Sequence, residues 1–141
     1  MADALHVEAR WTGGLSAVAT ARGHELHVDE PPHAGGRDAG MMPTELLCAS
    51  LASCFCLAVA WVAAKRDVDL PGLRVKVDAE RVGRELRYGR VRVEVAAAGA
   101  DDLGALVERA RPLCWVSNML ADDIEVTYVH KELAPAAADA G

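Results

Sequence analysis

The stretch ELLCASLASCFCLAVAW, residues 45–61, decides the fold, because it lies within an uncharged run of 19 residues, 46–64. Its helix-forming composition predicts one long helix over residues 44–65, with Thr44 as N-cap and Glu45 at the positive end of the helix dipole. By length alone the run could span a bilayer. It is mostly Ala, Ser and Cys, however, and the amphipathic segments on both sides need a surface to pack on. We therefore predict a buried core helix and no membrane span.

Segments of alternating apolar and polar residues flank this helix and predict strands. Those before the helix are residues 6–11, 15–21 and 24–29. In the last of them, Glu25, His27 and Asp29 fall on the polar face. The segment that follows, residues 30–43, contains three prolines and three glycines and is predicted to be a loop.

After the long helix, further strands are predicted at residues 73–82, 90–95 and 124–130. Between the last two, residues 103–120 predict a helix or a helix pair, with Asp101 or Asp102 as N-cap and a kink or break at Pro112. The order is three strands, a long helix, two strands, a helix or helix pair, and a strand. This order predicts an α+β fold with antiparallel sheets around the central helix.

Composition and charge describe a globular chain that is expected to form a single domain, residues 1–141, with a low-complexity tail at 134–141 that frays. The net charge of -6 argues against nucleic-acid binding. The N-terminus lacks a basic segment followed by an apolar one, as a secretory signal would have, so we expect a cytoplasmic protein. Small side chains on every side of the long helix allow close approach by a second copy, so we predict a homodimer.

Three of the four cysteines lie in the apolar run, and the fourth is Cys114. In a cytoplasmic chain such thiols indicate catalysis, redox sensing or metal binding more often than structural disulfides. On a helix Cys54 and Cys56 point about 200° apart, and Cys48 lies about 9 Å from Cys54 along the axis, so neither pair can form a disulfide in place. Cys114 remains as the intrachain partner. The spacings lack the paired ligands of a zinc site, so no metal is predicted, and we interpret Cys48 and Cys56 as buried apolar residues.

Several motifs together resemble the OsmC/Ohr family. They are the loop GGRDAG at residues 35–40, PTELL from Pro43, Cys54 within ASLASCF, and Cys114 within CWVSNML, where the family usually has CPVS. The likeness covers about residues 6–130. It implies a βββα-ββ-α-β fold and an intertwined homodimer with its two sites at the dimer interface. It also implies a peroxidase that reduces organic hydroperoxides with its own thiols and no cofactor.

The resemblance makes Cys54 the peroxidatic cysteine and Cys114 the resolving one. The Cys54 thiolate would attack the peroxide, and the resulting sulfenate would condense with Cys114 into a disulfide. An external dithiol, which in this family is often a lipoylated protein, would then reduce the disulfide.

The resemblance also implies a cation beside the thiolate, because a thiol buried in an apolar helix does not ionise readily. The family uses a loop arginine held by a glutamate that directly follows the proline. Arg37 is the best match, with Arg10 and Arg22 as alternatives. The glutamate position holds Thr44, and the nearest acid, Glu45, points about 100° away from it on a helix. Glu45 can equally be interpreted as a first-turn acid on the helix dipole.

Trp115 stands where the family usually has proline. With Thr44, it resembles an OsmC-like branch whose members need not be efficient peroxidases. Two functions therefore stay open. One is an organic hydroperoxide reductase that uses Cys54 and Cys114. The other is a stress or ligand-binding protein of the same fold, with an apolar pocket and little or no turnover, and the reactivity of Cys54 towards a thiol reagent across pH would separate the two.

Overall fold

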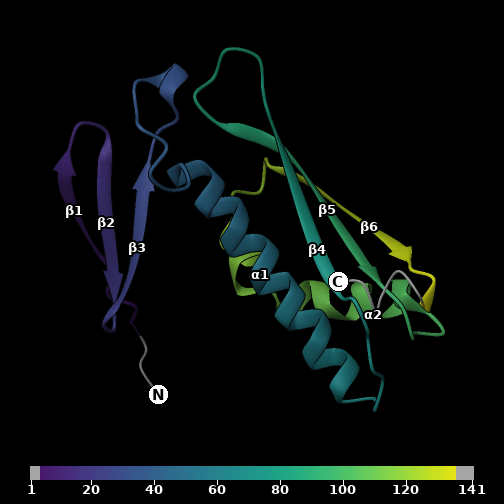
Figure 1. Cartoon of the computed structure of the whole chain (residues 1–141). Coiled ribbons are helices and arrows are strands. Elements are labelled where there is room, and N and C mark those ends of the chain that lie inside the picture. The colour runs from purple at the N-terminus through teal and green to yellow at the C-terminus, as the bar shows by residue number, and fades with distance from the viewer. Residues whose placement is uncertain (1–3, 136–141) are drawn as a thin grey trace. The chain divides into compact units, whose positions relative to one another are not determined.

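A computed structural model describes residues 4–135 of the chain (Figure 1). The chain forms two compact units, Met1–Leu47 and Cys48–Gly141. The single domain predicted for residues 1–141 stays a prediction. The tail predicted to fray at 134–141 lies outside the described residues from position 136 onward.

The N-terminal unit contains a three-stranded antiparallel sheet with the strand order β1-β2-β3. Its strands are β1 (Glu8–Gly13), β2 (Ser16–Ala21) and β3 (His24–Asp29), which confirms the three predicted strands to within two residues at each end. Gly14 and Gly23 form the turns between them with positive φ angles, which glycine adopts without steric cost. Asp29, the last strand residue, is only 1% exposed, whereas Glu25 and His27, which alternation places on the same face, are exposed.

The loop after β3 contains a short 3-10 helix, η1 (Pro32–Ala34), and leads into the long helix α1 (Pro43–Ala64). Proline suits the first helical position, because the N–H that it lacks would have no helical partner there. The Glu45 carboxylate accepts a hydrogen bond from the backbone N–H of Met42 at 3.1 Å, as in a capping box. The prediction of Thr44 as N-cap is wrong, because the helix already begins at Pro43.

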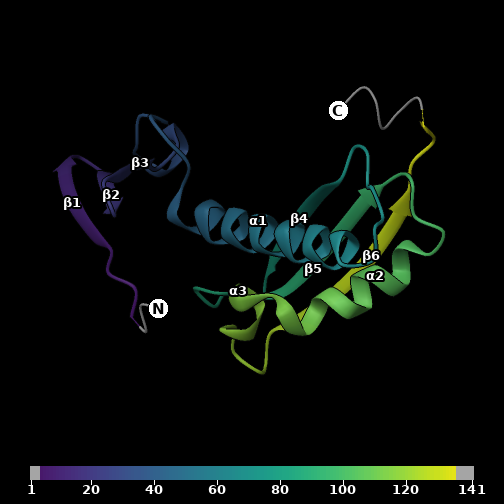
Figure 2. The same ribbon diagram turned by 90° about the horizontal axis from the view of Figure 1, so that it is seen from below.

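The C-terminal unit contains a second three-stranded sheet with the order β4-β5-β6. Its strands are β4 (Arg74–Arg81), β5 (Tyr88–Ala97) and β6 (Glu125–Glu132). β4 and β5 are antiparallel as predicted, but β5 and β6 are parallel, so the expectation of purely antiparallel sheets is wrong for this pair. The helix α2 (Leu103–Ala110) lies beside β6 (Figure 2) and forms the crossover that a parallel connection needs.

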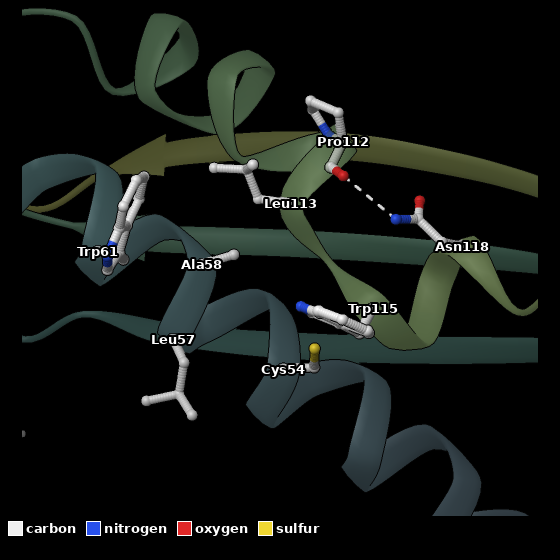
Figure 3. A pocket seen from close by; sticks show the side chains of 8 residues that line it. All are labelled: Cys54, Leu57, Ala58, Trp61, Pro112, Leu113, Trp115 and Asn118. Atoms are coloured by element: carbon white, nitrogen blue, oxygen red, sulfur yellow. Dashed lines mark hydrogen bonds between the residues drawn. The ribbon is translucent and has the colours of Figure 1, made fainter. Parts of the chain in front are cut away.

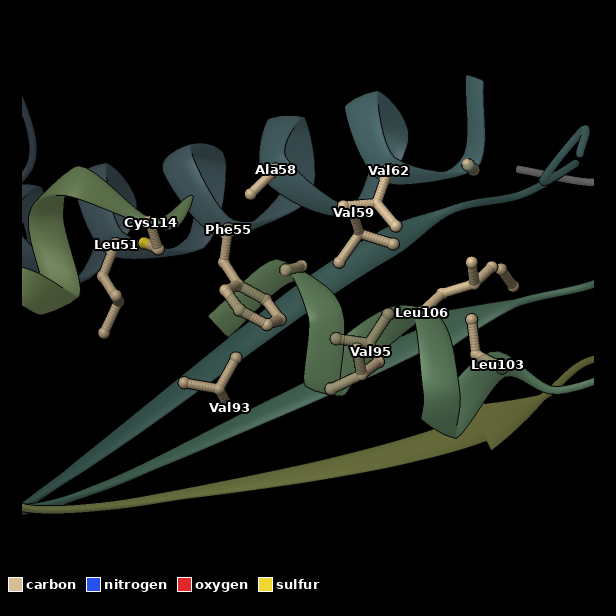
Figure 4. Close-up of a cluster of buried hydrophobic side chains, with 14 of the residues drawn as sticks. Leu51, Phe55, Ala58, Val59, Val62, Val93, Val95, Leu103, Leu106 and Cys114 are labelled. Carbon is tan, nitrogen blue, oxygen red and sulfur yellow. The ribbon is translucent and has the colours of Figure 1, made fainter. Parts of the chain in front are cut away.

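The core of this unit lies between the sheet and one face of α1 (Figure 4). Its main side chains are Leu51, Phe55, Val59 and Val62 of α1, Val91, Val93 and Val95 of β5, and Leu103, Leu106 and Val107 of α2. The ring of Phe55 lies 4.9 Å from the ring of Tyr128, measured between centroids. This aromatic contact ties the middle of α1 to the last strand of the sheet.

Helix α1 is buried along one face, whereas its composition predicted burial all round. Leu57 and Trp61 on the other side are 70% and 55% exposed. With 22 residues, α1 is long and apolar enough to cross a membrane by length and composition alone. Its buried face nevertheless forms part of the core of a folded α+β unit, which is the role of a core helix.

Candidate active site

Cys54 lines a cavity of about 650 Å³ in the C-terminal unit (Figure 3). One wall of the cavity is α1, and the other is the segment that follows α2. The lining residues are Cys54, Leu57, Ala58, Trp61, Pro112, Leu113, Trp115 and Asn118. None of these side chains is charged, so the cavity suits an apolar molecule, with the Cys54 sulfur among its few polar groups.

The α1 wall follows from helix periodicity. Cys54, Leu57, Ala58 and Trp61 have the spacing i, i+3, i+4, i+7, which places them on one face of the helix. Cys54 directly precedes the fully buried Phe55, and its own side chain is partly buried against the core. The Cys54 thiol thus lies at the boundary between the packed face of α1 and the face that lines the cavity.

The opposite wall begins where α2 ends. Asp102 caps α2 by accepting a hydrogen bond from the backbone N–H of Ala105 at 2.9 Å, which confirms one of the two predicted caps. The helix ends at Ala110, and Pro112 lies in the 3-10 turn η2 (Arg111–Leu113), so the predicted break at this proline is confirmed. A single further turn, α3 (Trp115–Asn118), completes the wall.

Cys114 lies between η2 and α3, and its side chain is fully buried in the apolar core. Its carbonyl oxygen accepts hydrogen bonds from the Ser117 hydroxyl and from the Asn118 backbone N–H, both at 3.1 Å. Cys54 packs against the same core, and both cysteines are free thiols. The two cysteines predicted to react therefore pack into the same hydrophobic core, and of the two only Cys54 lines the cavity.

The other two cysteines of α1 are partly buried. Burial raises the pKa of the Cys56 thiol, which favours the neutral and less reactive form. Neither Cys48 nor Cys56 lines the cavity beside Cys54. Among residues 4–135, no group of three or more His, Cys, Asp or Glu side chains is placed to hold a metal ion.

Arg37 lies in the N-terminal unit, in the loop between η1 and α1, with an exposed side chain. The buried Asp29 carboxylate organises this loop by accepting hydrogen bonds from the backbone N–H groups of Glu30 at 2.8 Å and Ala39 at 3.2 Å. Burial raises the pKa of the Asp29 carboxyl, but hydrogen bonds from backbone groups, that of Ala39 first, outweigh it and hold the pKa below its ordinary value. Sequence reasoning missed this residue, and the available signal was an acid directly before a glycine-rich loop.

Glu45 lies in the first turn of α1, where its carboxylate is bonded to the Met42 N–H. Cys54 lies nine positions further along the helix, which is about 13.5 Å along the axis and half a turn around it. Its carboxylate therefore makes no direct contact with the thiol. The alternative cations, Arg10 and Arg22, lie on β1 and in the turn between β2 and β3.

Comparison with known proteins identifies the family. The family described as OsmC-like protein matches residues 35–129. An organic hydroperoxide resistance protein of Xanthomonas axonopodis pv. citri is 32% identical over 124 residues, which cover 82% of this chain and 87% of that protein. The chain belongs to the OsmC-like family, as its glycine loop and cysteine motifs suggest.

Solved structures share the fold. An OsmC-like protein from Mycoplasma pneumoniae has a TM-score of 0.80 at 14% identity, covering 95% of this chain and 100% of that one. An organic hydroperoxide resistance protein from Elizabethkingia anophelis has a TM-score of 0.73 at 23% identity, covering 94% of this chain and 99% of that one. These similarities confirm the predicted α+β, OsmC-like architecture.

Proposed function

We propose that this protein is a thiol-dependent peroxidase that reduces organic hydroperoxides to alcohols. The observation that carries the proposal is the partly exposed Cys54 thiol in an apolar cavity, with the second thiol, Cys114, buried in the core against which Cys54 packs. The 32% identical relative named for organic hydroperoxide resistance supports the same substrate class. The uncharged lining suits the organic group of such a substrate.

In the proposed reaction, the Cys54 thiolate attacks the terminal peroxide oxygen. The S–O bond forms as the O–O bond breaks, and the alkoxide takes up a proton and leaves as the alcohol. The Cys114 thiol then attacks the Cys54 sulfenic acid, so that a disulfide forms and water leaves. An external dithiol, for which a lipoylated protein is our candidate, reduces the disulfide and returns both thiols.

The different burial of the two cysteines supports this division of roles. Cys54 lines the cavity and can meet a hydroperoxide, whereas Cys114 is fully buried and is shielded from direct oxidation. Susceptibility to oxidation follows exposure and thiolate character, so the accessible thiol reacts first. The shielded thiol remains reduced and is available for the second step.

We propose Arg37 as the cation that stabilises the Cys54 thiolate, and Glu45 as a supporting residue that fixes the start of α1 behind the loop. The Glu45 hydrogen bond to Met42 supports the second role. Arg37→Ala should slow the alkylation of Cys54 by iodoacetamide at neutral pH, because it would reduce the thiolate fraction. An unchanged rate in Arg37→Ala would remove Arg37 from the site, and Arg10→Ala and Arg22→Ala would then test the two alternative cations.

The decisive test is the intact mass of the reduced protein after one equivalent of cumene hydroperoxide, followed by peptide mapping. We expect a loss of two hydrogens that maps to a bond between Cys54 and Cys114. Cys54→Ser should stay unmodified, Cys114→Ala should gain one oxygen on Cys54, and Cys56→Ser should behave as the wild type. A disulfide that forms equally well without Cys114 would overturn its resolving role.

The alternative is a ligand-binding or stress protein of the same fold with little or no turnover. The observation in its favour is the cavity itself, which has the size and apolar lining of a small-molecule site. An unchanged mass after exposure to hydroperoxide would support this alternative. Retention of an apolar ligand by the unmodified protein would then define the function.

We also propose a cytoplasmic homodimer that binds neither nucleic acid nor membrane. The exposed apolar side chains of α1, Leu57 and Trp61, are consistent with a surface that a second copy covers. Light scattering should give twice the 14.9 kDa of one chain, and a monomer at working concentration would contradict the dimer.

A further inference from the structure

Two of the three tryptophans of the chain line the cavity beside Cys54. Trp61 comes from α1 and Trp115 from the start of α3, and they are 55% and 81% exposed. Figure 3 shows Trp115 and Cys54 together among the side chains that line the cavity. Trp11, the third tryptophan, lies in the N-terminal unit and donates its indole N–H to the Gly14 carbonyl at 3.0 Å. Aromatic surface is thus placed where a hydroperoxide would approach the thiol.

The two cavity tryptophans differ in what holds them. The Nζ of Lys65 lies 5.3 Å from the centre of the Trp61 ring, so a cation already occupies part of that indole surface. Within residues 4–135, no comparable ring contact engages the Trp115 indole. Such a large apolar ring gains free energy when another apolar surface covers it. Trp115 is therefore the residue with a free aromatic face toward the cavity.

The backbone that carries Trp115 is fixed on both sides. The buried Cys114 precedes it, and the side-chain amide of Asn118 donates a hydrogen bond to the Pro112 carbonyl at 3.1 Å (Figure 3). These contacts hold the short α3 turn against η2, so the indole is attached to an ordered wall. A ring presented in this way can orient a ligand without a large loss of backbone entropy.

The lining also limits the chemistry of the ligand. It contains no Lys or Arg that would pair with a carboxylate, and no acid that would pair with a cation. Flat aromatic groups gain from offset or edge-to-face contact with an indole, which a compact aliphatic group cannot reproduce. The complementary organic group is therefore neutral and aromatic.

We propose that Trp115 is a specificity-determining residue that selects hydroperoxides whose peroxide-bearing carbon carries a neutral aromatic ring. The ring stacks against the indole, and the O–O group faces the Cys54 sulfur. This inference rests on the proposed peroxidase function and specifies its substrate.

The kinetic test compares cumene hydroperoxide with tert-butyl hydroperoxide, which differ by a phenyl group in place of one methyl group. Trp115→Leu keeps an apolar side chain without a π face and should lower the ratio of the two kcat/KM values by about three- to tenfold. The change should arise mainly in the KM for cumene hydroperoxide, because stacking is present before and during the chemical step. Trp115→Phe should restore most of the preference, and Trp11→Leu, a change in the N-terminal unit outside the cavity lining, is the control.

A binding experiment separates this inference from the peroxidase proposal. In the Cys54→Ser protein, the indole N–H signals of the three tryptophans are followed by NMR during titration with 2-phenyl-2-propanol or tert-butanol. The Trp115 signal should shift with the aryl alcohol and respond less to tert-butanol. The Trp11 signal should not shift with either alcohol. If the wild type had no peroxidase activity, a shift of the Trp115 signal would still support the aromatic wall, and the proposed peroxidase function would be refuted. An active peroxidase with an unshifted Trp115 signal and an unchanged substrate ratio in Trp115→Leu would overturn the inference.

Discussion

The loop between β3 and α1 and the segment between α2 and β6 each carry a proposed site residue, but different forces hold them. In the loop, the buried Asp29 carboxylate accepts hydrogen bonds from the N–H groups of Glu30 and Ala39. In the segment, the fully buried Cys114 side chain is packed in the apolar core. The loop around Arg37 therefore depends on charge and hydrogen-bond geometry, and the segment depends on packed volume.

Close backbone contacts are a second difference between the loop and the segment. A Cβ atom on Gly36 would overlap the carbonyl oxygen of Glu30, and one on Gly40 would overlap the carbonyl oxygen of His27. The loop thus closes on the end of β3 only because these two residues lack side chains. Residues 111–118 contain no glycine, so close backbone approach of this kind is not what shapes the segment.

Aromatic packing supports the start of the segment instead. The guanidinium carbon of Arg111 lies 4.5 Å from the centre of the Tyr128 ring, and that ring also contacts Phe55. The side chain of Phe55 is fully buried. The wall that carries Trp115 is therefore linked through Tyr128 to the middle of α1.

The largest effect is expected from Phe55→Ala, which removes the centre of this packing. It should lower the free energy of unfolding by about 3–5 kcal/mol, because it deletes a buried ring and leaves a cavity beneath the segment. Urea denaturation measures the loss. Leu86→Ala is the control, because this side chain lies between β4 and β5 and is 97% exposed, and it should cost about 0.5 kcal/mol or less. Similar losses in the two variants would contradict the conclusion that packed volume stabilises this region.

A smaller effect is expected from Gly36→Ala in the loop. The added methyl group would meet a backbone oxygen that cannot rotate away, so the variant should lose about 3 kcal/mol, the upper end for overpacking. Gly14→Ala is the matched control, because its Cβ would meet no atom within 4 Å and the cost of about 1 kcal/mol comes from its positive φ alone. Equal losses in urea denaturation would show that the loop moves away from β3 without penalty.

Local signals in the sequence predicted most of the elements. Alternation gave the strands, and Asp102 and Pro112 marked the start and end of α2 correctly. The direction of β6 was missed because it depends on the path of the crossover and not on the alternation within the strand. The one-sided burial of α1 was missed because a helix that is apolar all round carries no signal for which face will be covered.

The candidate site shows the same division between local and non-local information. Cys54 and Cys114 could be nominated from motifs, but the cavity that joins Trp61 to Trp115 exists only after two distant segments pack together. Alternation placed Asp29 on the face of Glu25 and His27, and its burial was missed because its partner Ala39 lies ten residues further along, beyond the reach of strand periodicity. Sequence patterns misplace the residues whose surroundings are formed by segments that are distant in the sequence.

The smallest effect is expected in acid and concerns Asp29. The hydrogen bonds keep the pKa of its carboxyl in the folded protein below the ordinary 3.8, so the unfolded chain takes up this proton first as the pH falls. The contribution of the carboxylate to stability is therefore complete above pH 3.8 and is lost as the pH falls through the folded-state pKa. Asp29→Asn should be less stable than the wild type at neutral pH, and the gap should narrow in acid.

Urea midpoints of the wild type and Asp29→Asn, measured from about pH 6 to about pH 2, would follow this gap. Asp38→Asn is the matched control, because Asp38 is an exposed acid of the same loop and its positive φ suits asparagine. It should follow the wild type across the range. A gap for Asp29→Asn that stays constant down to the lowest pH would mean that the shape of the side chain, and not its charge, holds the loop. The loop and the segment around Cys114 would then be stabilised by the same force.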